Sequence, residues 1–158
     1  MIYYVDDKDV PGLPWSPARV LTDLFEEIDR MSAVVGARGK LPYIGMIRDM
    51  AYPFIGIDDD GVFHWIAIER NIEVGHRQTA DRGEILYWAL EDTTSVLASN
   101  WKLEHPRRGQ EQRVTGWIRQ FDLLYKLNPA WAQRCRQELA DTLVDVPDTG
   151  IPPLPGPV

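Results

Sequence analysis

The chain has only one cysteine, Cys135, among its 158 residues, so an intrachain disulfide is excluded. Cys135 lies in a helical pattern with Trp131 and Leu139, where a small buried thiol is the expected role. No apolar run approaches the roughly 20 residues that a membrane-spanning helix needs. The first residues, MIYYVDDKDVPG, contain neither the basic nor the apolar segment of a secretory signal. These absences predict a protein of the reducing cytoplasm.

The common signatures of catalysis are also missing. The sequence contains no G-x-G-x-x-G, no Walker lysine loop and no G-x-S-x-G. Its three histidines, His64, His76 and His105, lack the H-x-x-x-H and H-E-x-x-H spacings of zinc sites. The run Asp58-Asp59-Asp60-Gly61 fails the ligand spacing of a calcium loop, and a solvated hairpin tip is the better interpretation. We therefore predict no catalytic residue, no metal site and no cofactor.

Positive charge is scarce in the N-terminal part of the chain. The whole chain has 17 basic and 24 acidic side chains, a net charge of −7. Residues 1–100 contain nine Lys or Arg against 17 Asp or Glu, whereas residues 101–158 contain eight against seven. An excess of acid disfavours nonspecific binding to nucleic acid or to an anionic membrane. A cationic partner is the better match.

What is present is the patterning of a globular α+β fold, a small antiparallel β-meander packed with about four helices. Alternating apolar residues and the turn signals Asp60-Gly61 and Arg70-Asn71 predict strands over 54–58, 62–69 and 72–79. Helical spacing and capping residues predict helices over 17–36, 81–102, about 109–127 and 129–144.

The predicted domain organisation is simple. Residues 1–144 should form a single α+β domain, because the chain is too short for two comfortable cores. Residues 145–158, DVPDTGIPPLPGPV, are rich in proline and lack periodicity, so an extended or mobile tail is expected. Residues 37–51 are interpreted as a loop that leads into the first of the three strands.

Trp88 poses a question about the helix over 81–102. Its apolar seam contains Leu86, Leu90 and Leu97, while Trp88 falls on the opposite side with Ser95. One interpretation places the leucine seam on the sheet and the Trp88 side against the C-terminal helices. The other leaves Trp88 and its neighbour exposed as aromatic anchors with an acidic rim, a composition that protein interfaces favour.

Several motifs resemble the immunity protein 63 family of bacterial polymorphic-toxin systems over residues 62–140. The resemblance rests on the Glu69-Arg70 turn, the EILYW stretch at 84–88 and the later W-x-x-R-x-x-x-E spacing. The other residues that carry it are Arg77, Thr79, His105, Gln120, Leu123, Leu124, Leu127, Pro129, Trp131, Arg134 and Glu138. It implies a small non-catalytic cytoplasmic protein, encoded beside a toxin, that binds the toxin domain and blocks it.

The expected contact surface is acidic with aromatic anchors and would fit a cationic cleft of the cognate toxin. Its predicted members are Asp58, Asp59, Asp60, Glu84, Tyr87, Trp88, Glu91 and Asp92. Two other hypotheses stay open. One is a small hydrolase or transferase with a carboxylate site near Glu84, Tyr87, Glu91 and His64. The other is an adaptor whose IPPLPGP segment is bound by an aromatic groove.

Overall fold

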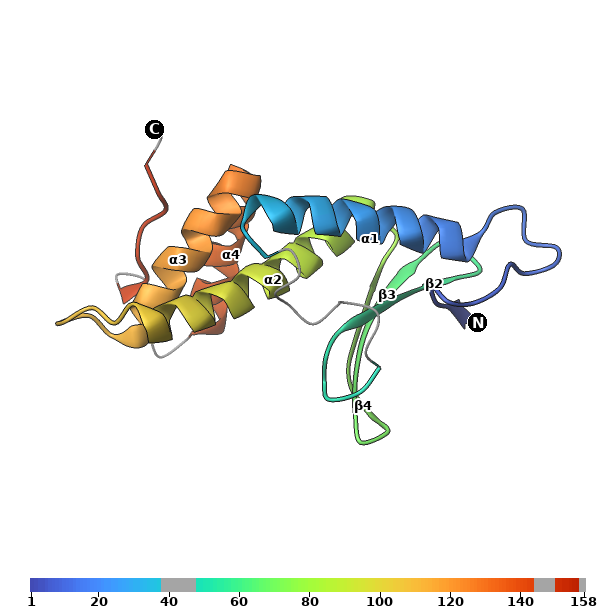
Figure 1. The fold of residues 1–158 in the computed structure, drawn as a ribbon, viewed down its shortest axis with the longest axis horizontal. Helices are drawn as coiled ribbons and strands as arrows, with labels where there is room; N and C mark the ends of the chain where they lie inside the picture. The colour runs from blue at the N-terminus through green and yellow to red at the C-terminus, as the bar shows by residue number, and fades with distance from the viewer. Residues whose placement is uncertain (38–47, 144–149, 157–158) are drawn as a thin grey trace. The chain divides into compact units, whose positions relative to one another are not determined.

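The computed structural model describes residues 1–37, 48–143 and 150–156, and it confirms the α+β class (Figure 1). A four-stranded antiparallel sheet is followed by three consecutive helices, with one further helix near the N-terminus. The elements are β1 Ile2–Tyr3, α1 Pro17–Val34, β2 Phe54–Asp58, β3 Phe63–Glu69, β4 Ile72–Thr79, α2 Arg82–Glu104, α3 Gln112–Leu127 and α4 Pro129–Thr142. The short strand β1 was not expected from the sequence, because two residues carry no periodicity.

The helices begin where local chemistry predicts. The Ser16 hydroxyl accepts a hydrogen bond from the Arg19 N–H, which caps α1. The Asp81 carboxylate accepts from the N–H groups of Gly83 and Glu84 at the start of α2. The Asn128 side chain accepts from the Ala130 N–H before the proline of α4. At the other end of α1, Gly36 adopts a φ of +78°, which a side chain would resist.

The sheet has the order β1-β2-β3-β4, so each strand pairs with its neighbour in sequence. Arg70 and Asn71 both adopt positive φ in the two-residue turn that joins β3 to β4, as a tight hairpin requires. In the register, Gly56 faces His64 and Ile55 faces Trp65 across β2 and β3. Because adjacent residues on a strand point to opposite faces, His64 and Trp65 mark the two faces of the sheet.

Both faces of the sheet are covered. On the Trp65 face, the Trp88 ring from α2 meets the Trp65 ring edge-on at 6.4 Å between centroids. On the His64 face, the side chains of Ile2 in β1 and of Tyr4 after it lie so close to Gly56 that an added Cβ would be 2.4 Å from the Ile2 Cγ2 atom. Only glycine is compatible with that approach.

The environment of α2 corrects one prediction. The Trp88 side of the helix was predicted to contact the C-terminal helices, and its contact with Trp65 shows that it lies on the sheet instead. Residues 85–90 are all buried, so the helix is covered on several sides there. An ion pair between Arg82 and Glu27, with N···O of 2.7 Å, connects the first turn of α2 to α1. Hydropathy around the helix could not assign one face to the sheet, because residues 85–90 are all apolar and all buried.

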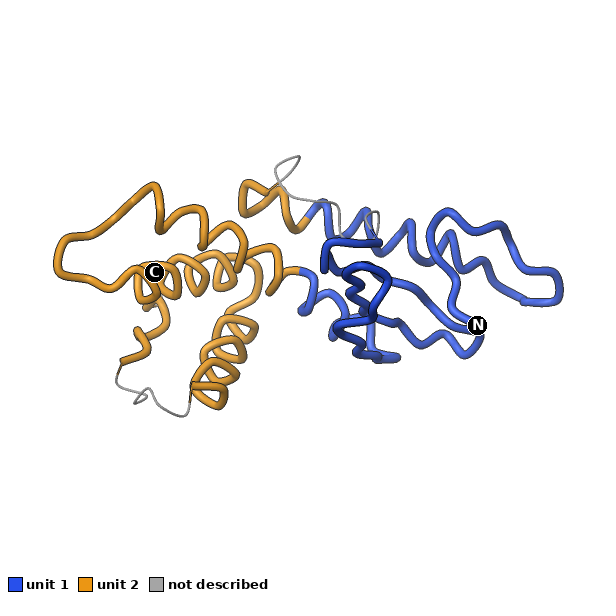
Figure 2. The backbone as a smooth tube through the Cα atoms, turned by 90° about the horizontal axis from the view of Figure 1, so that it is seen from below, with its two compact units in different colours: residues 1–30, 40–89 blue, residues 31–39, 90–158 orange. Residues whose placement is uncertain are grey.

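The chain divides by its internal contacts into two compact units (Figure 2). Unit 1 comprises residues 1–30 and 40–89, and unit 2 comprises residues 31–39 and 90–158, so α1 and α2 contribute to both. Unit 1 contains the sheet. Unit 2 contains α3, α4 and a buried cluster of Phe121, Leu124, Ala132, Cys135 and Ile151. The buried state of the Cys135 thiol is as predicted, and the boundary between a single domain and a tail at residue 145 stays a prediction.

The described part of the proline-rich segment, residues 150–156, is packed. Ile151 is buried in the cluster of unit 2, and Leu154 packs against that cluster. The Arg136 guanidinium of α4 donates hydrogen bonds to the carbonyl oxygens of Ile151 and Pro152, at 3.1 and 2.9 Å. Residues 150–156 therefore pack within unit 2, and the expectation of an extended or mobile tail over 145–158 stays a prediction. Although the segment has no apolar periodicity, its residue Ile151 is buried in the cluster of unit 2. Part of the predicted 37–51 loop and residues 144–149 lie outside the described residues.

Candidate functional site

The hairpin tip, residues 58–62 between β2 and β3, is shaped by the Asp58 carboxylate. Its Oδ1 atom accepts hydrogen bonds from the backbone N–H groups of Asp60, at 2.9 Å, and Val62, at 3.0 Å. Gly61 supplies the positive φ of +79° that the turn needs. Asp59 and Asp60 are exposed at this tip. The tip therefore presents two carboxylates from a backbone that Asp58 fixes.

Asp59 is held from the side by the N-terminal strand. The Tyr3 hydroxyl donates a hydrogen bond to Asp59 Oδ1, and this bond lowers the pKa of the Asp59 carboxyl. The same contact raises the pKa of the Tyr3 hydroxyl. Asp59 thus stays ionised at neutral pH while half of its side chain, 53%, remains exposed.

A line of four hydrogen-bonded side chains, here named the histidine network, runs across the sheet from this tip. Asp58 Oδ2 lies 2.8 Å from His64 Nε2. His64 Nδ1 lies 2.7 Å from His76 Nε2, and His76 Nδ1 lies 2.9 Å from Glu73 Oε1. Burial raises the pKa of the Asp58 carboxyl, but the hydrogen bonds from His64, Val62 and Asp60 outweigh it, so the net direction is downward.

A β-bulge brings Glu73 into the network. Residues 73 and 76 are separated by an odd number, so a regular strand would point their side chains to opposite faces. In β4, however, Gly75 faces Ala67 while Glu73 faces Ile68, which leaves Val74 as an extra residue. The bulge returns Glu73 to the face of His64 and His76. Sequence reasoning missed the network because neither this register shift nor the cross-strand pairing has a local signature.

The predicted contact residues of α2 have different surroundings. Tyr87 and Trp88 are buried, with only 1% and 8% of their surface exposed. They belong to the core and are not surface anchors in this structure. The Arg77 guanidinium from β4 lies 4.4 Å above the Trp88 ring and covers it. Glu84, Glu91 and Asp92 are half-buried. Of the eight predicted members, Asp59 and Asp60 are the exposed ones.

The hypothetical carboxylate site near Glu84 and His64 does not form. His64 points to the sheet face opposite the one on which Trp88 of α2 packs. Its ring nitrogens contact Asp58 and His76, and neither contact involves α2. Tyr87, the third residue of that hypothesis, is fully buried in the helix. The groups that the enzyme hypothesis needed in one pocket are therefore separated by the sheet.

Comparison with known protein families gives one match. The model of the family described as Immunity protein 63 matches residues 59–141, just over half of the chain. The chain belongs to the immunity protein 63 family. No curated protein and no solved structure matches it.

The segment shared with the immunity protein 63 family begins inside the hairpin tip, at residue 59, and ends in α4, at residue 141. It includes three members of the histidine network, namely His64, Glu73 and His76. Asp58 lies immediately before it. The resemblance expected from the sequence over 62–140 is thus confirmed.

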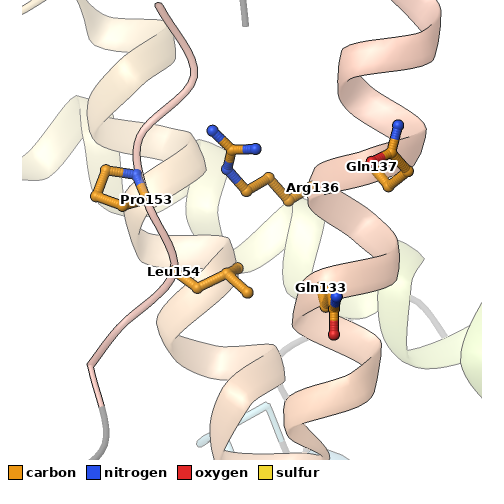
Figure 3. Close-up of a pocket in the computed structure, with 5 residues that line it drawn as sticks. All are labelled: Gln133, Arg136, Gln137, Pro153 and Leu154. Carbon is orange, nitrogen blue, oxygen red and sulfur yellow. The ribbon is translucent and has the colours of Figure 1, made fainter. Parts of the chain in front are cut away.

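Unit 2 of this member of the immunity protein 63 family contains surface hollows, and two of them are lined by described residues. One, of about 390 Å³, lies between α4 and the C-terminal segment and is lined by Gln133, Arg136, Gln137, Pro153 and Leu154 (Figure 3). The other, of about 170 Å³, is lined by Trp101, Arg107, Gln110, Thr115, Ile118, Arg119 and Asp122. Within the described ranges, no group of three or more His, Cys, Asp or Glu could hold a metal ion. Nor does any described helix have the length and apolarity to cross a membrane.

Proposed function

We propose that this protein binds a toxin domain encoded beside it and neutralises that toxin by covering a cationic active cleft. Membership of the immunity protein 63 family supports a toxin as the partner. The net charge of −7 supports a cationic surface on that toxin. A partner of this kind needs no bond-making chemistry from the immunity protein.

The observation that carries the proposal is the hairpin tip. It places Asp59 and Asp60 on the surface, on a turn whose backbone is fixed by hydrogen bonds to Asp58. A preorganised pair of carboxylates loses little conformational freedom when it enters a cleft lined by Lys or Arg. Its field also accelerates the encounter with a cationic partner.

The contact surface proposed here is narrower than the sequence suggested. Tyr87 and Trp88 are core residues, so binding energy at this surface comes from the acids of the tip and not from those aromatics. Glu84, Glu91 and Asp92 are half-buried on α2, at the margin of this surface. A stable block needs a total interface on the order of 1,600 Å², so residues around the tip must also contribute.

A charge-reversal experiment tests the tip. The double variant Asp59→Lys/Asp60→Lys should slow association with the toxin domain by about tenfold at low salt, with a smaller effect at high salt. Asp58 is left unchanged because it holds the turn. The measurement is the association rate constant over a salt series, together with residual toxin activity at equimolar immunity protein.

A matched control separates contact from net charge. The double variant Asp23→Lys/Glu26→Lys makes the same change in charge at two exposed positions of α1. It should alter the association rate by less than about threefold, because charges outside the contact act only at long range. Equal slowing by both double variants would show that the tip is not the contact surface. A toxin that stays fully active in excess wild-type protein would refute the function itself.

A further inference from the structure

The histidine network contains more hydrogen bonds than two neutral histidines can supply. Its three contacts, at 2.8, 2.7 and 2.9 Å, are all at hydrogen-bonding distance. Each contact needs one hydrogen between its two atoms. A neutral imidazole has one N–H group and an ionised carboxylate has none, so the four side chains would bring only two hydrogens. Two hydrogens cannot make three bonds.

We propose that His64 and His76 together bind one additional proton, which lies between their facing ring nitrogens. The outer N–H of His64 then donates to Asp58, and the outer N–H of His76 donates to Glu73. The result is a single imidazolium shared by two rings and flanked by two carboxylates. The positive charge of this imidazolium lies within unit 1.

A proton fits this position better than a metal ion. Two nitrogens bound to one tetrahedral zinc ion lie roughly 3.3 Å apart, because each Zn–N bond is about 2.0–2.1 Å. The facing nitrogens of His64 and His76 are 2.7 Å apart, which is a hydrogen-bond length. A stable zinc site also needs further protein ligands, and the described residues form no group of three or more suitable side chains.

The surroundings make the absence of this proton costly. Only 7% of the His64 surface is exposed, so a lone pair on its Nδ1 atom could not turn to water, whereas 32% of the His76 side chain is exposed. The N-terminal segment covers the same face, with the Tyr4 ring 5.7 Å from Phe54 and the Arg48 guanidinium 4.1 Å above Tyr4. Without the proton, one of the three bonds must be lost.

Further charged groups surround the Tyr4 ring that covers this face. Burial raises the pKa of the Tyr4 hydroxyl, the Arg48 charge opposes that rise, and the charges of Asp7 and Glu73 add to it. Arg48 is itself paired with Asp6. The acids that contact the network are Asp58 of β2 and Glu73 of β4, and the covering cation, Arg48, already has its own carboxylate partner.

The proton has a consequence for the proposed function, on which this step rests. Asp58 ends the network with Oδ2 and holds the hairpin tip with Oδ1. Loss of the proton opens one of the three contacts, and opening of the His64–Asp58 contact removes a restraint on the tip. We expect toxin affinity at pH 8 to be about three- to tenfold lower than at pH 6.

The proton can be counted on the isolated protein. Long-range ¹H–¹⁵N spectra of uniformly labelled wild-type protein report the protonation of each ring nitrogen. At pH 6.5 the four nitrogens of His64 and His76 should carry three hydrogens. Two neutral rings at this pH would overturn the proposal.

A variant gives an independent measurement. The replacement His76→Gln keeps a donor for Glu73 and an acceptor or donor for His64 without needing an extra proton. Between pH 6.5 and 8, the unfolding equilibrium constant of the wild type should rise by up to about tenfold per pH unit, because the folded state releases a proton on unfolding. In His76→Gln the rise should be much smaller, and the control His105→Gln should behave like the wild type. Equal slopes in wild type and His76→Gln would contradict the shared proton.

Two further outcomes are distinguished by the design. If micromolar Zn²⁺, added after chelation, shifts the ring signals of His64 and His76 with one-to-one stoichiometry, the site is a metal site and the proton proposal is wrong. If the spectra show the extra proton but no toxin is bound at any pH, the proton proposal stands and the proposed function fails.

Discussion

Asp58 shows how one residue can serve both a turn and a longer network. One carboxylate oxygen accepts two backbone N–H groups of the hairpin tip, and the other contacts the His64 ring. The sequence placed Asp58 among the residues that contact the toxin. In the structure its two oxygens are engaged inside the protein, so its contribution to binding is to position Asp59 and Asp60.

The lowered pKa of Asp58 gives a prediction about acid stability. A folded-state pKa below the unfolded value of about 3.9 stabilises the protein above that pH, and this stabilisation is lost as the pH falls through the folded-state value. Asp58→Asn should therefore lower the free energy of unfolding at pH 7 by roughly 1.5–3 kcal/mol, the range for a hydrogen bond to a charged group. The difference from wild type should shrink between pH 4 and pH 2.

Urea unfolding followed by circular dichroism at pH 7, 4 and 2.5 measures this difference. Asp23→Asn, which removes an exposed acid of α1, serves as the control and should change stability by less than about 0.5 kcal/mol. A constant difference between Asp58→Asn and wild type across the three pH values would show that the ionised form of Asp58 contributes nothing.

Local chemistry at single residues was predictable from the sequence. Ser16, Asp81 and Asn128 cap helices as expected, because a capping residue acts on N–H groups only two or three positions away. The histidine network was not predictable. It depends on the pairing of β3 with β4 and on the bulge at Val74, which are set by residues far apart in the chain.

At the scale of elements, the bounds of α2 were predicted correctly, but the side of the helix that faces the sheet was not. Its expected range of 81–102 is close to Arg82–Glu104. The expected orientation failed because residues 85–90 are all buried, so the leucine seam does not single out the sheet-facing side. Trp88 contacts the Trp65 ring of the sheet.

A truncation of Trp88 tests whether it is core or contact surface. Trp88→Ala should lower the free energy of unfolding by about 3–5 kcal/mol, because a buried indole against Trp65 and Arg77 leaves a cavity. The control Leu103→Ala changes an apolar residue of the same helix that is 64% exposed, and it should cost less than about 0.5 kcal/mol. Thermal or urea unfolding measures both.

The same pair of variants would detect the alternative interpretation. If Trp88→Ala is as stable as Leu103→Ala while its toxin affinity falls strongly, then Trp88 is exposed in solution and belongs to the contact surface. If stability falls and the folded fraction keeps its toxin affinity, Trp88 is a core residue.

At the scale of the whole molecule, the motif resemblance over residues 62–140 predicted the family that the match over residues 59–141 shows. The acidic excess and the absence of catalytic motifs agreed with that family but did not identify it. The division into two compact units was not foreseen, because α1 and α2 run through both and no composition break marks a boundary. The packing of residues 150–156 was also missed, since one apolar residue among prolines is a weak signal.

The buried position of Ile151 leads to a prediction about unit 2. Ile151 shares a buried cluster with Phe121, Leu124 and Cys135, although it lies in the segment that the sequence marked as a tail. Ile151→Ala should lower the free energy of unfolding by roughly 2–4 kcal/mol, the cost of removing a buried isoleucine side chain.

The same variant should also speed the reaction of the Cys135 thiol with a thiol reagent, because local opening of the cluster exposes that cysteine. The control is Pro153→Ala, which changes an exposed residue of the same segment. It should leave both the free energy of unfolding and the thiol reactivity near the wild-type values. Unchanged stability and unchanged thiol reactivity in Ile151→Ala would mean that the segment is detached from α4 in solution, which would return it to the free tail that an adaptor function requires.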